Sequence, residues 1–196
     1  MNDLKIISLK GQDILPYIPE LAKLRINTFK EYPYLYEGNL EYEYKYLDTY
    51  IKCSDCMIIL VIDGSEVVGA STSIPMEFET SEFKQPFLDN LINPRDIFYF
   101  GESVLRPEYR GRNIYRHFFS LRENNAKKYG SKVVTFAAIE RPEDDARKPQ
   151  NYIPLNDVWK HFGYTKHPEL RTQFEWQEVG EQTPTYKTLI FWMKQL

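Results

Sequence analysis

The chain of 196 residues has few residues suited to metal or redox chemistry, with only two cysteines and three histidines. Zinc takes about four ligands, but Cys53 and Cys56 are joined by no second Cys-x-x-Cys pair and no close histidine pair. A thioredoxin-type pair should begin a helix, whereas Cys56 runs directly into the apolar residues MIILVI. We therefore expect no metal site and a structural role for both cysteines. The three histidines show no partner spacing and are assigned surface or packing roles.

The sequence also lacks long apolar runs and an excess of basic residues. No stretch approaches the length needed to cross a membrane, and the opening MNDLKIISLK has neither the apolar run nor the cleavage site of a secretory signal. Lysine and arginine number 25 against 28 acidic residues, so the net charge is −3 and the pI about 5.7. Nucleic-acid-binding proteins usually carry a broad basic face. We expect a cytoplasmic protein with no membrane and no nucleic-acid partner.

The length and a hydrophobic content of 42% fit one globular domain over residues 1–196, without internal repeat or linker. In the first half, LKIISL predicts a strand, and Pro19 suits the first turn of a helix. Asn39 is placed to cap a second helix, and Asp63-Gly64 is a tight-turn pair between two apolar runs of a hairpin. The helix faces expected to be apolar are Ile18, Ala22, Ile26 and Phe29, then Leu40, Tyr44, Leu47 and Ile51.

In the second half, residues 76–96 form a polar, proline-punctuated insert with a short helix expected around residues 87–92, of the kind that often serves as a lid or binding loop. The elements expected after it are a strand over 96–105, a helix with Ile114, Phe118 and Leu121 on one face and Gly130 at its end, a strand over 132–139, a short helix capped by Asn156 and ended by Gly163, and a strand over 185–196. This order predicts a mixed α/β fold with a largely antiparallel sheet.

Four arginines surround one glycine in RPEYRGRNIYRHFF, residues 106–119, at the expected start of a helix. We call Arg106, Arg110, Arg112 and Arg116 the arginine cluster. A helix start presents free N–H groups and partial positive charge, so it binds anions such as pyrophosphate well. Neither GxxxxGK(S/T) nor GxGxxG is present. The residues favour a phosphate site, with a solvated helix start as the alternative.

The run VLRPEYRGRNIYRHFF resembles motif A of the GNAT superfamily of acetyl-CoA-dependent N-acetyltransferases, and WKHFGY is similar to that family's late helix with its Gly-aromatic end. The resemblance extends from residue 4 to the end and looks closest to a bacterial subgroup sometimes joined to carbon–nitrogen hydrolase domains. It implies a GNAT-like acyl-CoA N-acyltransferase fold, with a central, mostly antiparallel sheet flanked by helices. It also implies acetyl-CoA as cosubstrate and a small amine as acceptor.

The resemblance transfers the motif (Q/R)-x-x-G-x-(G/A) onto residues 110–115. Asn113 and Tyr115 stand where the family has small residues, so the Tyr115 ring must swing aside, while asparagine tolerates a positive φ. The family binds the pantetheine arm along the edge of the strand that precedes the motif, which splays from the next strand. The cofactor-binding residues implied are Ser103, Val104, Leu105, Arg110, Gly111, Arg112, Asn113, Ile114, Tyr115 and Arg116.

Amine acetylation needs a proton acceptor, and Glu102 is the only carboxylate in the strand that leads to the motif. Strand alternation turns Glu102 away from the face of Leu105, although a bulge at Gly101 could reverse it. We expect Glu102 to be catalytic, with pairing to an arginine as the alternative. The family's leaving-group tyrosine falls on Trp159, so this role does not carry over. Tyr152 or Tyr164 could substitute, although packing is the simpler role for either.

Seven of the fifteen tyrosines lie between residues 32 and 50. Tyr32, Tyr34 and Tyr36, with Glu31 and Glu37, could form an aromatic, anionic pocket for a protonated amine. The alternative is a helix junction packed by tyrosines.

Three functions stay open from the sequence. The first is an N-acetyltransferase that acts on a primary amine of a small molecule or peptide. The second is a non-catalytic acyl-CoA-binding or regulatory domain of the same fold, suggested by Asn113, Tyr115 and Trp159. The third is an unrelated phosphate-ligand protein. The apolar strand LIFWM could also pair across a homodimer.

Overall fold

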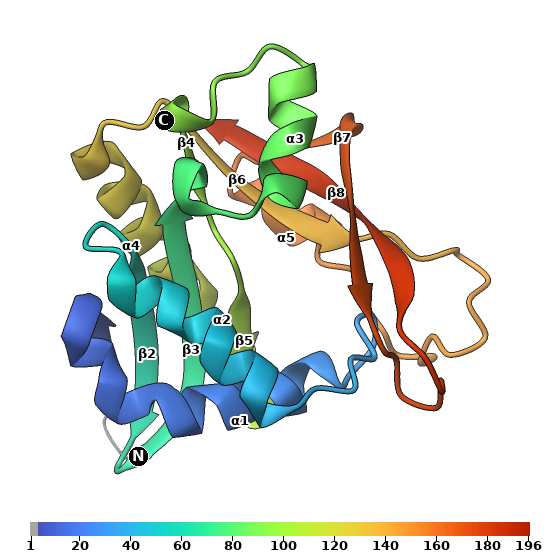
Figure 1. Cartoon of the computed structure of the whole chain (residues 1–196). Coiled ribbons are helices and arrows are strands. Elements are labelled where there is room, and N and C mark those ends of the chain that lie inside the picture. The colour runs from blue at the N-terminus through green and yellow to red at the C-terminus, as the bar shows by residue number, and fades with distance from the viewer. Residues whose placement is uncertain (1–3) are drawn as a thin grey trace.

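The computed structural model describes residues 4–196 and shows a mixed α/β fold built on an eight-stranded sheet (Figure 1). The strand order is β1-β2-β3-β4-β6-β8-β7, and β5 pairs with β3 beside this path. Of the strand pairs among the described residues, β4 with β6 is parallel and the others are antiparallel. The strands are β1 Lys5–Leu9, β2 Met57–Asp63, β3 Glu66–Pro75, β4 Ile97–Tyr99, β5 Ser103–Leu105, β6 Val133–Ile139, β7 Thr165–Trp176 and β8 Thr185–Gln195.

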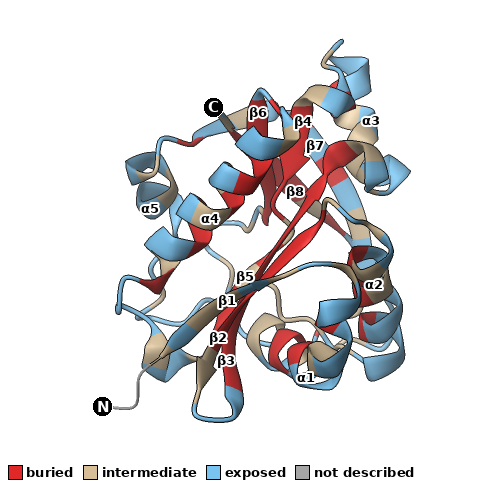
Figure 2. Cartoon of the chain, turned by 90° about the vertical axis from the view of Figure 1, so that its left-hand side faces the viewer, coloured by how far each residue is buried: buried red, intermediate tan, exposed pale blue. Residues whose placement is uncertain are grey.

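Helices cover both faces of the sheet. α1 and α2 lie across the front of β2, β3 and β5, while α4 lies behind them (Figure 1). Figure 2 shows that the buried residues run along the central strands and along the inner side of α4. The α-helices are α1 Ile18–Phe29, α2 Leu40–Lys52, α3 Ser81–Asp89, α4 Ile114–Tyr129 and α5 Asn156–His161, and the 3₁₀ helices are Gly11–Tyr17, Met76–Phe78, Pro94–Asp96 and Pro107–Tyr109.

Several local signals in the sequence have the expected effect. The Asn39 side chain caps α2 by accepting a hydrogen bond of 2.9 Å from the Tyr42 N–H. Gly64 lies at the hairpin turn between β2 and β3 with φ of +60°, and Gly130 ends α4 with φ of +93°. These predictions are confirmed because each depends on residues close together in the chain.

The face of α2 that packs against the protein differs from the expected one. Leu40 and Tyr44 are both 41% exposed, whereas Glu43, Leu47 and Tyr50 are buried. The apolar pattern was misleading because a glutamate occupies the centre of the buried face. Its carboxylate is ion-paired with buried Arg25 of α1, so burial of Glu43 requires a partner from another helix.

Other boundaries also need correction. α3 spans Ser81–Asp89 rather than residues 87–92, because residues 90–92 form a turn after it. Asn156 is the first residue of α5, and the residue at the cap position, Leu155, makes no side-chain cap. The stretch 96–105 forms two short strands, β4 and β5, rather than one.

The apolar strand LIFWM lies inside the sheet. It belongs to β8, which pairs with β6 along one edge and with β7 along the other. Both edges are therefore occupied within the chain. The expectation that this strand pairs across a homodimer was wrong.

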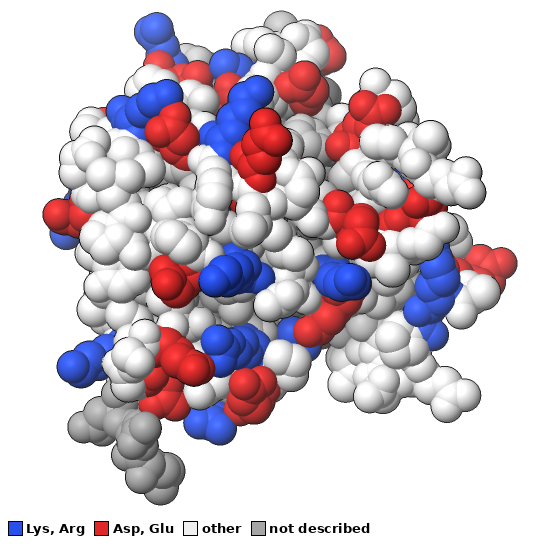
Figure 3. Space-filling view, turned by 60° about the horizontal axis from the view of Figure 1, so that its bottom comes forward, with Lys and Arg blue, Asp and Glu red and all other residues white. Residues whose placement is uncertain are grey.

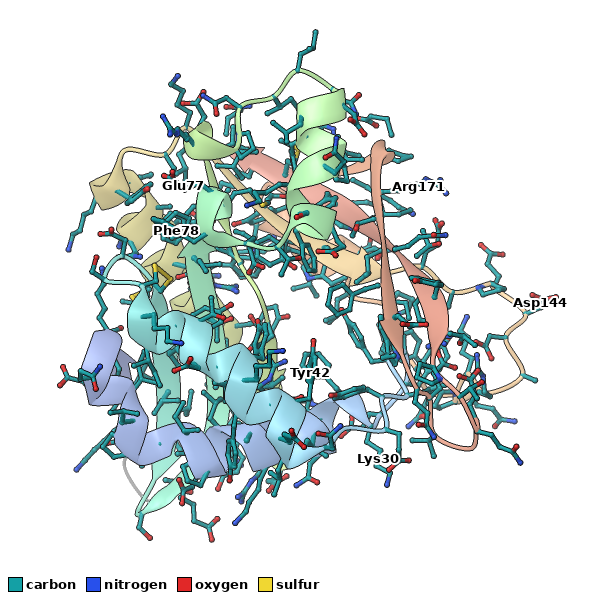
Figure 4. All side chains as sticks on the ribbon, in the orientation of Figure 1. Lys30, Tyr42, Glu77, Phe78, Asp144 and Arg171 are labelled. Atoms are coloured by element: carbon teal, nitrogen blue, oxygen red, sulfur yellow. A yellow bond between two sulfur atoms is a disulfide. The ribbon has the colours of Figure 1, made fainter. Side chains whose placement is uncertain are left out.

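Cys53 and Cys56 form a disulfide between the end of α2 and the start of β2 (Figure 4). The bridge closes the short turn between these elements, and the Asp55 carbonyl in this turn accepts a 3.1 Å hydrogen bond from the Asn125 side chain of α4. The contacts agree with the structural role expected for the cysteines.

The break between β4 and β5 lies at Gly101, where helix α2 approaches the sheet closely. A Cβ atom at this position would lie 2.6 Å from both Thr72 Oγ1 and Tyr50 Oη, and 2.9 Å from Tyr46 Oη. Only glycine leaves room for these hydroxyls. Tyr99 and Val104 are packed in the same cluster although five positions separate them, so alternation is reset at the break.

We expect Gly101→Ala to destabilise the protein by about 1–3 kcal/mol, because the added methyl group overpacks the three hydroxyls. Gly111→Ala is the control, since nothing lies within 4 Å of its Cβ and its φ of +75° adds only backbone strain, about 1 kcal/mol. Urea unfolding measures the decrease in the free energy of unfolding for both variants. Adding Tyr50→Phe should recover part of the Gly101→Ala loss, and no recovery would show that overpacking is not its cause.

Candidate functional site

A cavity of about 650 Å³ lies where β5 separates from β6. The last hydrogen bond between the two segments joins Phe100 N–H to the Thr135 carbonyl at 2.8 Å. Beyond it, β5 pairs with β3 and leaves its other edge free. The splayed strands expected from the resemblance are therefore present. The cavity walls here are residues 100–103 on one side and residues 136–142 on the other.

The free edge of β5 carries the backbone groups of alternate residues. The Glu102 carbonyl accepts from Thr72 N–H at 3.1 Å and Arg106 N–H donates to the Val68 carbonyl at 3.0 Å, so even-numbered residues bond to β3. Because the bonding direction alternates in an antiparallel pair, the backbone N–H and carbonyl groups of Ser103 and Leu105 point to the free edge, away from β3. Val104 instead turns its backbone to β3 and buries its side chain, so it supports the edge from behind.

The N-terminus of α4 has the form expected of an anion site. Asn113 adopts a left-handed conformation with φ of +63° and makes no side-chain cap, and the first turn contains no acidic residue. Gly111 also has positive φ, at +75°. Ile114 buries its side chain, so only its backbone N–H can face a ligand. The helix start thus presents unpaired N–H groups and the positive end of a dipole.

Half of the arginine cluster is neutralised by carboxylates. Arg106 pairs with Glu66 at 2.8 Å. Arg110 pairs with Glu31 at 2.9 Å and also donates to the Leu105 carbonyl at 3.1 Å.

The other two arginines remain available for an anion. Arg112 lies over the Tyr109 ring, 5.0 Å from its centroid, and Arg116 donates to the Asn113 side-chain oxygen at 3.2 Å. Neither has a carboxylate within 4.0 Å among residues 4–196. On the lower face of the molecule, basic and acidic side chains are interspersed rather than gathered by sign (Figure 3).

The Tyr115 ring turns inward and lines the cavity. It packs edge-on against Phe119, with ring centroids 5.5 Å apart. Burial raises the pKa of Tyr115, whereas the charge of Arg122 and the nearby side chains of Trp159 and Ser103 lower it. The ring therefore swings aside as the motif requires, but into the cavity rather than into solvent.

The Glu102 carboxylate is part of a buried charged network. It pairs with Arg25, which also pairs with Glu43, and it accepts a 2.9 Å hydrogen bond from Tyr46 Oη. Tyr46 Oη lies 3.0 Å from Tyr50 Oη. Glu102 faces α1 and α2, opposite to Leu105, as alternation predicts. These contacts match the alternative of an arginine partner, and a catalytic role for Glu102 stays a prediction.

Glu79, in the insert between β3 and α3, is a titratable group that the sequence did not single out. Burial and the nearby charge of Glu102 raise the pKa of Glu79 to about 7, while the Thr80 N–H and Lys84 lower it. Its charge in turn raises the pKa of Tyr50 and Tyr99. Nothing in the local sequence distinguishes Glu79 from the other acids of the insert.

The tyrosine-rich segment only partly forms the expected acceptor pocket. Tyr32 and Tyr34 line the cavity, and Tyr32 packs edge-on against Tyr152 at 4.7 Å between centroids. Tyr36 lies outside the cavity lining and packs toward Tyr42 of α2, at 6.3 Å. Burial raises the pKa of Tyr36, and the nearby charge of Glu43 raises it further.

The acidic residues expected around the pocket, Glu31 and Glu37, are not the ones that line the cavity. Glu31 is ion-paired with Arg110, and Glu37 lies 3.8 Å from Lys30 on the surface. The acidic residues that line the cavity are instead Glu140, Glu143 and Glu102, and the carboxylate of Glu102 is paired with Arg25.

A second buried network holds the Tyr32–Tyr34 segment in place. Glu178, 1% exposed, pairs with Arg141 and Arg147. Arg141 also donates to the carbonyls of Pro33 at 2.7 Å and Tyr34 at 3.2 Å. The network joins the segment after α1, the β7–β8 hairpin and the loop before α5, whose outer bend carries Asp144 (Figure 4). The sequence could not show it, because its members come from distant segments.

Within residues 4–196, no group of three potential metal ligands lies together. Across the same residues, no helix combines the length and the apolar character needed to cross a bilayer.

No protein-family model and no curated protein matches the chain. Solved structures do match. A protein assigned as an acetyltransferase from Acinetobacter baylyi has a TM-score of 0.66 at 10% identity, covering 100% of this chain and 93% of that one. A protein assigned to the GNAT family from Desulfovibrio desulfuricans has a TM-score of 0.59 at 7% identity, covering 98% and 99%.

A third match is a protein assigned as an acetyltransferase from Salmonella typhimurium and solved with its cofactor acetyl-CoA. Its TM-score is 0.57 at 12% identity, covering 100% of this chain and 95% of that one. The chain therefore has the GNAT acetyltransferase fold. None of the three is described as joined to a carbon–nitrogen hydrolase domain, so the resemblance to that subgroup stays a prediction.

The raised pKa of Glu79 predicts a pH-dependent loss of stability. Between pH 4.5 and about 7 the unfolded state releases this proton while the folded state retains it, so rising pH favours unfolding. Glu79→Gln cannot ionise and should melt at a higher temperature than the wild type at pH 8, with the difference vanishing near pH 4.

Glu82→Gln is the matched control, because the pKa of exposed Glu82 is lowered rather than raised. This variant should show no gain in melting temperature at pH 8. A Glu79→Gln difference that stays constant from pH 4 to pH 8 would contradict the assignment.

Proposed function

We propose that the protein is an acetyl-CoA-dependent N-acetyltransferase that acts on a primary amine of a small molecule or peptide. The observation that carries the proposal is the free edge of β5, which opens a cavity directly beside the uncapped N-terminus of α4. The GNAT fold and the acetyl-CoA bound to the Salmonella protein support it. The acceptor itself is not specified by these features.

The residues present fit a nucleotide thioester. The N–H groups at Asn113–Tyr115 and the unpaired Arg112 and Arg116 would bind the pyrophosphate. The backbone groups of Ser103 and the Leu105 N–H, on the free edge of β5, would hydrogen-bond the amides of the pantetheine arm, while the Leu105 carbonyl accepts from Arg110. When bound, the thioester supplies an activated acetyl group.

The opposite end of the cavity suits an amine. The rings of Tyr32, Tyr34 and Tyr152 lie at this end, and rings of this kind attract a cation through their faces. The Glu178 network holds the backbone that carries Tyr32 and Tyr34. Aromatic walls on a fixed backbone would orient the amine toward the free edge of β5.

The amine must lose a proton as its nitrogen bonds to the carbonyl carbon. Glu102 is bound by Arg25 and Tyr46, and a neighbouring cation lowers the basicity of a carboxylate. Glu79 lies outside the cavity lining but near Glu102, and burial together with the charge of Glu102 raises its pKa to about 7, so it can accept a proton at neutral pH only through water. We therefore favour Glu79 as the acceptor, through water, and Glu102 as the residue that fixes the strand break.

Thermal melting tests ligand binding. Acetyl-CoA or CoA at about 100 times its Kd should stabilise the protein by about 2.7 kcal/mol, a rise of about 5–10 °C for a chain of this size. ATP and NAD should give much smaller shifts. Equal shifts for all of these ligands would indicate a nonspecific anion site and contradict the proposal.

A second binding experiment tests whether the two unpaired arginines of the cluster bind CoA. Arg112→Gln with Arg116→Gln should weaken CoA binding and reduce its salt dependence, because both charges are free of carboxylates. Lys127→Gln with Lys128→Gln, which removes two exposed charges from the last turn of α4, is the control and should leave binding unchanged. Equal effects in the two variants would show that the charges act only at long range.

Thiol release from acetyl-CoA with a panel of amines, amino sugars and peptides tests turnover. For an acceptor found this way, Glu79→Gln should lower kcat/KM at least about 10²-fold. It should also remove the fall in kcat/KM that the wild type shows below about pH 7. Glu102→Gln should mainly lower stability. If Glu102→Gln alone causes the large kinetic loss, Glu102 is the base. Binding without turnover of any amine would favour the non-catalytic acyl-CoA-binding domain.

A further inference from the structure

Arg122 of α4 is buried beside the cavity without a counter-ion. It is 2% exposed and is one of the residues that line the cavity. Its guanidinium donates to the carbonyls of Phe118 and Glu102, both at 3.3 Å. It stacks over Phe100 and Phe119, at 4.3 and 5.1 Å from the ring centroids. Among residues 4–196, no carboxylate lies within 4.0 Å of it.

The carboxylates nearest to Arg122 are already committed elsewhere. Glu102 pairs with Arg25. Glu123 pairs with Lys194 at 2.9 Å and accepts from Tyr164 Oη at 3.0 Å. Arg25 is also buried, but it lies between two carboxylates, so its charge is compensated and that of Arg122 is not. A buried charge without a partner is costly, and this one lies at the cavity wall.

Tyr115 places a hydroxyl group beside this charge. Its ring lines the cavity together with Ser103 of β5 and Trp159 of α5, and these two side chains lower its pKa. Arg122 is the charge that most affects the pKa of Tyr115, and burial keeps that pKa raised. At neutral pH the hydroxyl therefore retains its proton. A proton donor and an unpaired cation thus converge on the gap where β5 leaves β6.

We propose that Tyr115 and Arg122 form the site that receives the leaving thiolate of the acyl donor, an inference that rests on the proposed function. As the amine nitrogen bonds to the carbonyl carbon, the carbon–sulfur bond breaks and its electron pair goes to sulfur. The Tyr115 hydroxyl donates its proton to that sulfur, and Arg122 stabilises the negative charge before the transfer. The amine proton, accepted by Glu79 through water, then returns through water to the Tyr115 oxygen, which restores both the hydroxyl and the Glu79 carboxylate.

The two residues have different roles. Tyr115 would contact the reacting sulfur and is the catalytic residue, whereas Arg122 acts on the charge of that sulfur and on Tyr115. Trp159 lines the same cavity and would position Tyr115 through its indole N–H, a role that needs a donor but no acidic proton at residue 159. The sulfur of bound CoA should therefore ionise more readily than that of free CoA.

The test compares the binding of CoA with that of desulfo-CoA, which lacks the thiol, by calorimetry between pH 6 and pH 9. The other titratable groups that face the pair are Glu102, Glu123, Tyr164 and Arg110. Their titration, and that of Glu79, affects both ligands equally, so the ratio of the two Kd values reports the thiol alone. For a thiol pKa lowered by one unit, the ratio should shift about tenfold in favour of CoA as pH rises through the titration.

Variants of Arg122 and Tyr115 test whether these residues cause the pH-dependent shift in the Kd ratio. Arg122→Met keeps an unbranched side chain between the two phenylalanine rings and should abolish most of the shift, and Arg122→Lys should retain part of it. Tyr115→Phe should reduce the shift and lower kcat without a matching change in Kd for desulfo-CoA. Lys128→Gln removes an exposed charge from the last turn of the same helix and should leave the shift unchanged.

Identical pH profiles for CoA and desulfo-CoA in the wild type would overturn the inference while leaving the proposed function intact, and this comparison requires no variant to fold. Failure of both ligands to bind would overturn the proposed function and the inference with it. A shift that persists in Arg122→Met would show that another group stabilises the thiolate and would remove Arg122 from the site.

Discussion

The ion pairs of Arg25 with Glu43 and Glu102 are the interaction on which the site depends. They join α1, α2 and the break between β4 and β5 inside the protein, away from solvent. Removing one member would leave an uncompensated buried charge, which costs about 3–5 kcal/mol. Because Glu102 is held toward α1 and α2 and only glycine fits at residue 101, β5 is directed to β3 and away from β6. The cavity is a consequence of this geometry.

The opened strand edge gives the two ends of the cavity different chemistry. On the side of α4 lie the uncapped helix start and the unpaired charge of Arg122, which suit an anionic thioester donor. On the side of the segment after α1 lie the aromatic walls that the Glu178 network holds, which suit an organic cation. Three arginines thus have different functions. Buried Arg25 fixes the strand break, partly exposed Arg141 holds the backbone of Pro33 and Tyr34, and buried Arg122 lies at the cavity wall.

The sequence predicted what depends on neighbouring residues. The mixed α/β order, the Asn39 cap, the Asp63-Gly64 hairpin and the left-handed Asn113 all follow from local chemistry. The packed face of α2 did not, because Glu43 is buried only through Arg25, which lies 18 positions away. The inward turn of Tyr115 and the raised pKa of Glu79 likewise depend on distant contacts. An ion pair or a buried carboxyl leaves no periodic trace in the chain, so these features required the structure.

The central claim is that the gap between β5 and β6 receives the thioester. A crystal structure of the protein with bound CoA tests it most directly. The account predicts the pyrophosphate at the N–H groups of Asn113–Tyr115, the pantetheine arm along Ser103 and Leu105, and the sulfur beside Tyr115. CoA bound away from the gap, with Tyr115 still filling the cavity, would contradict it.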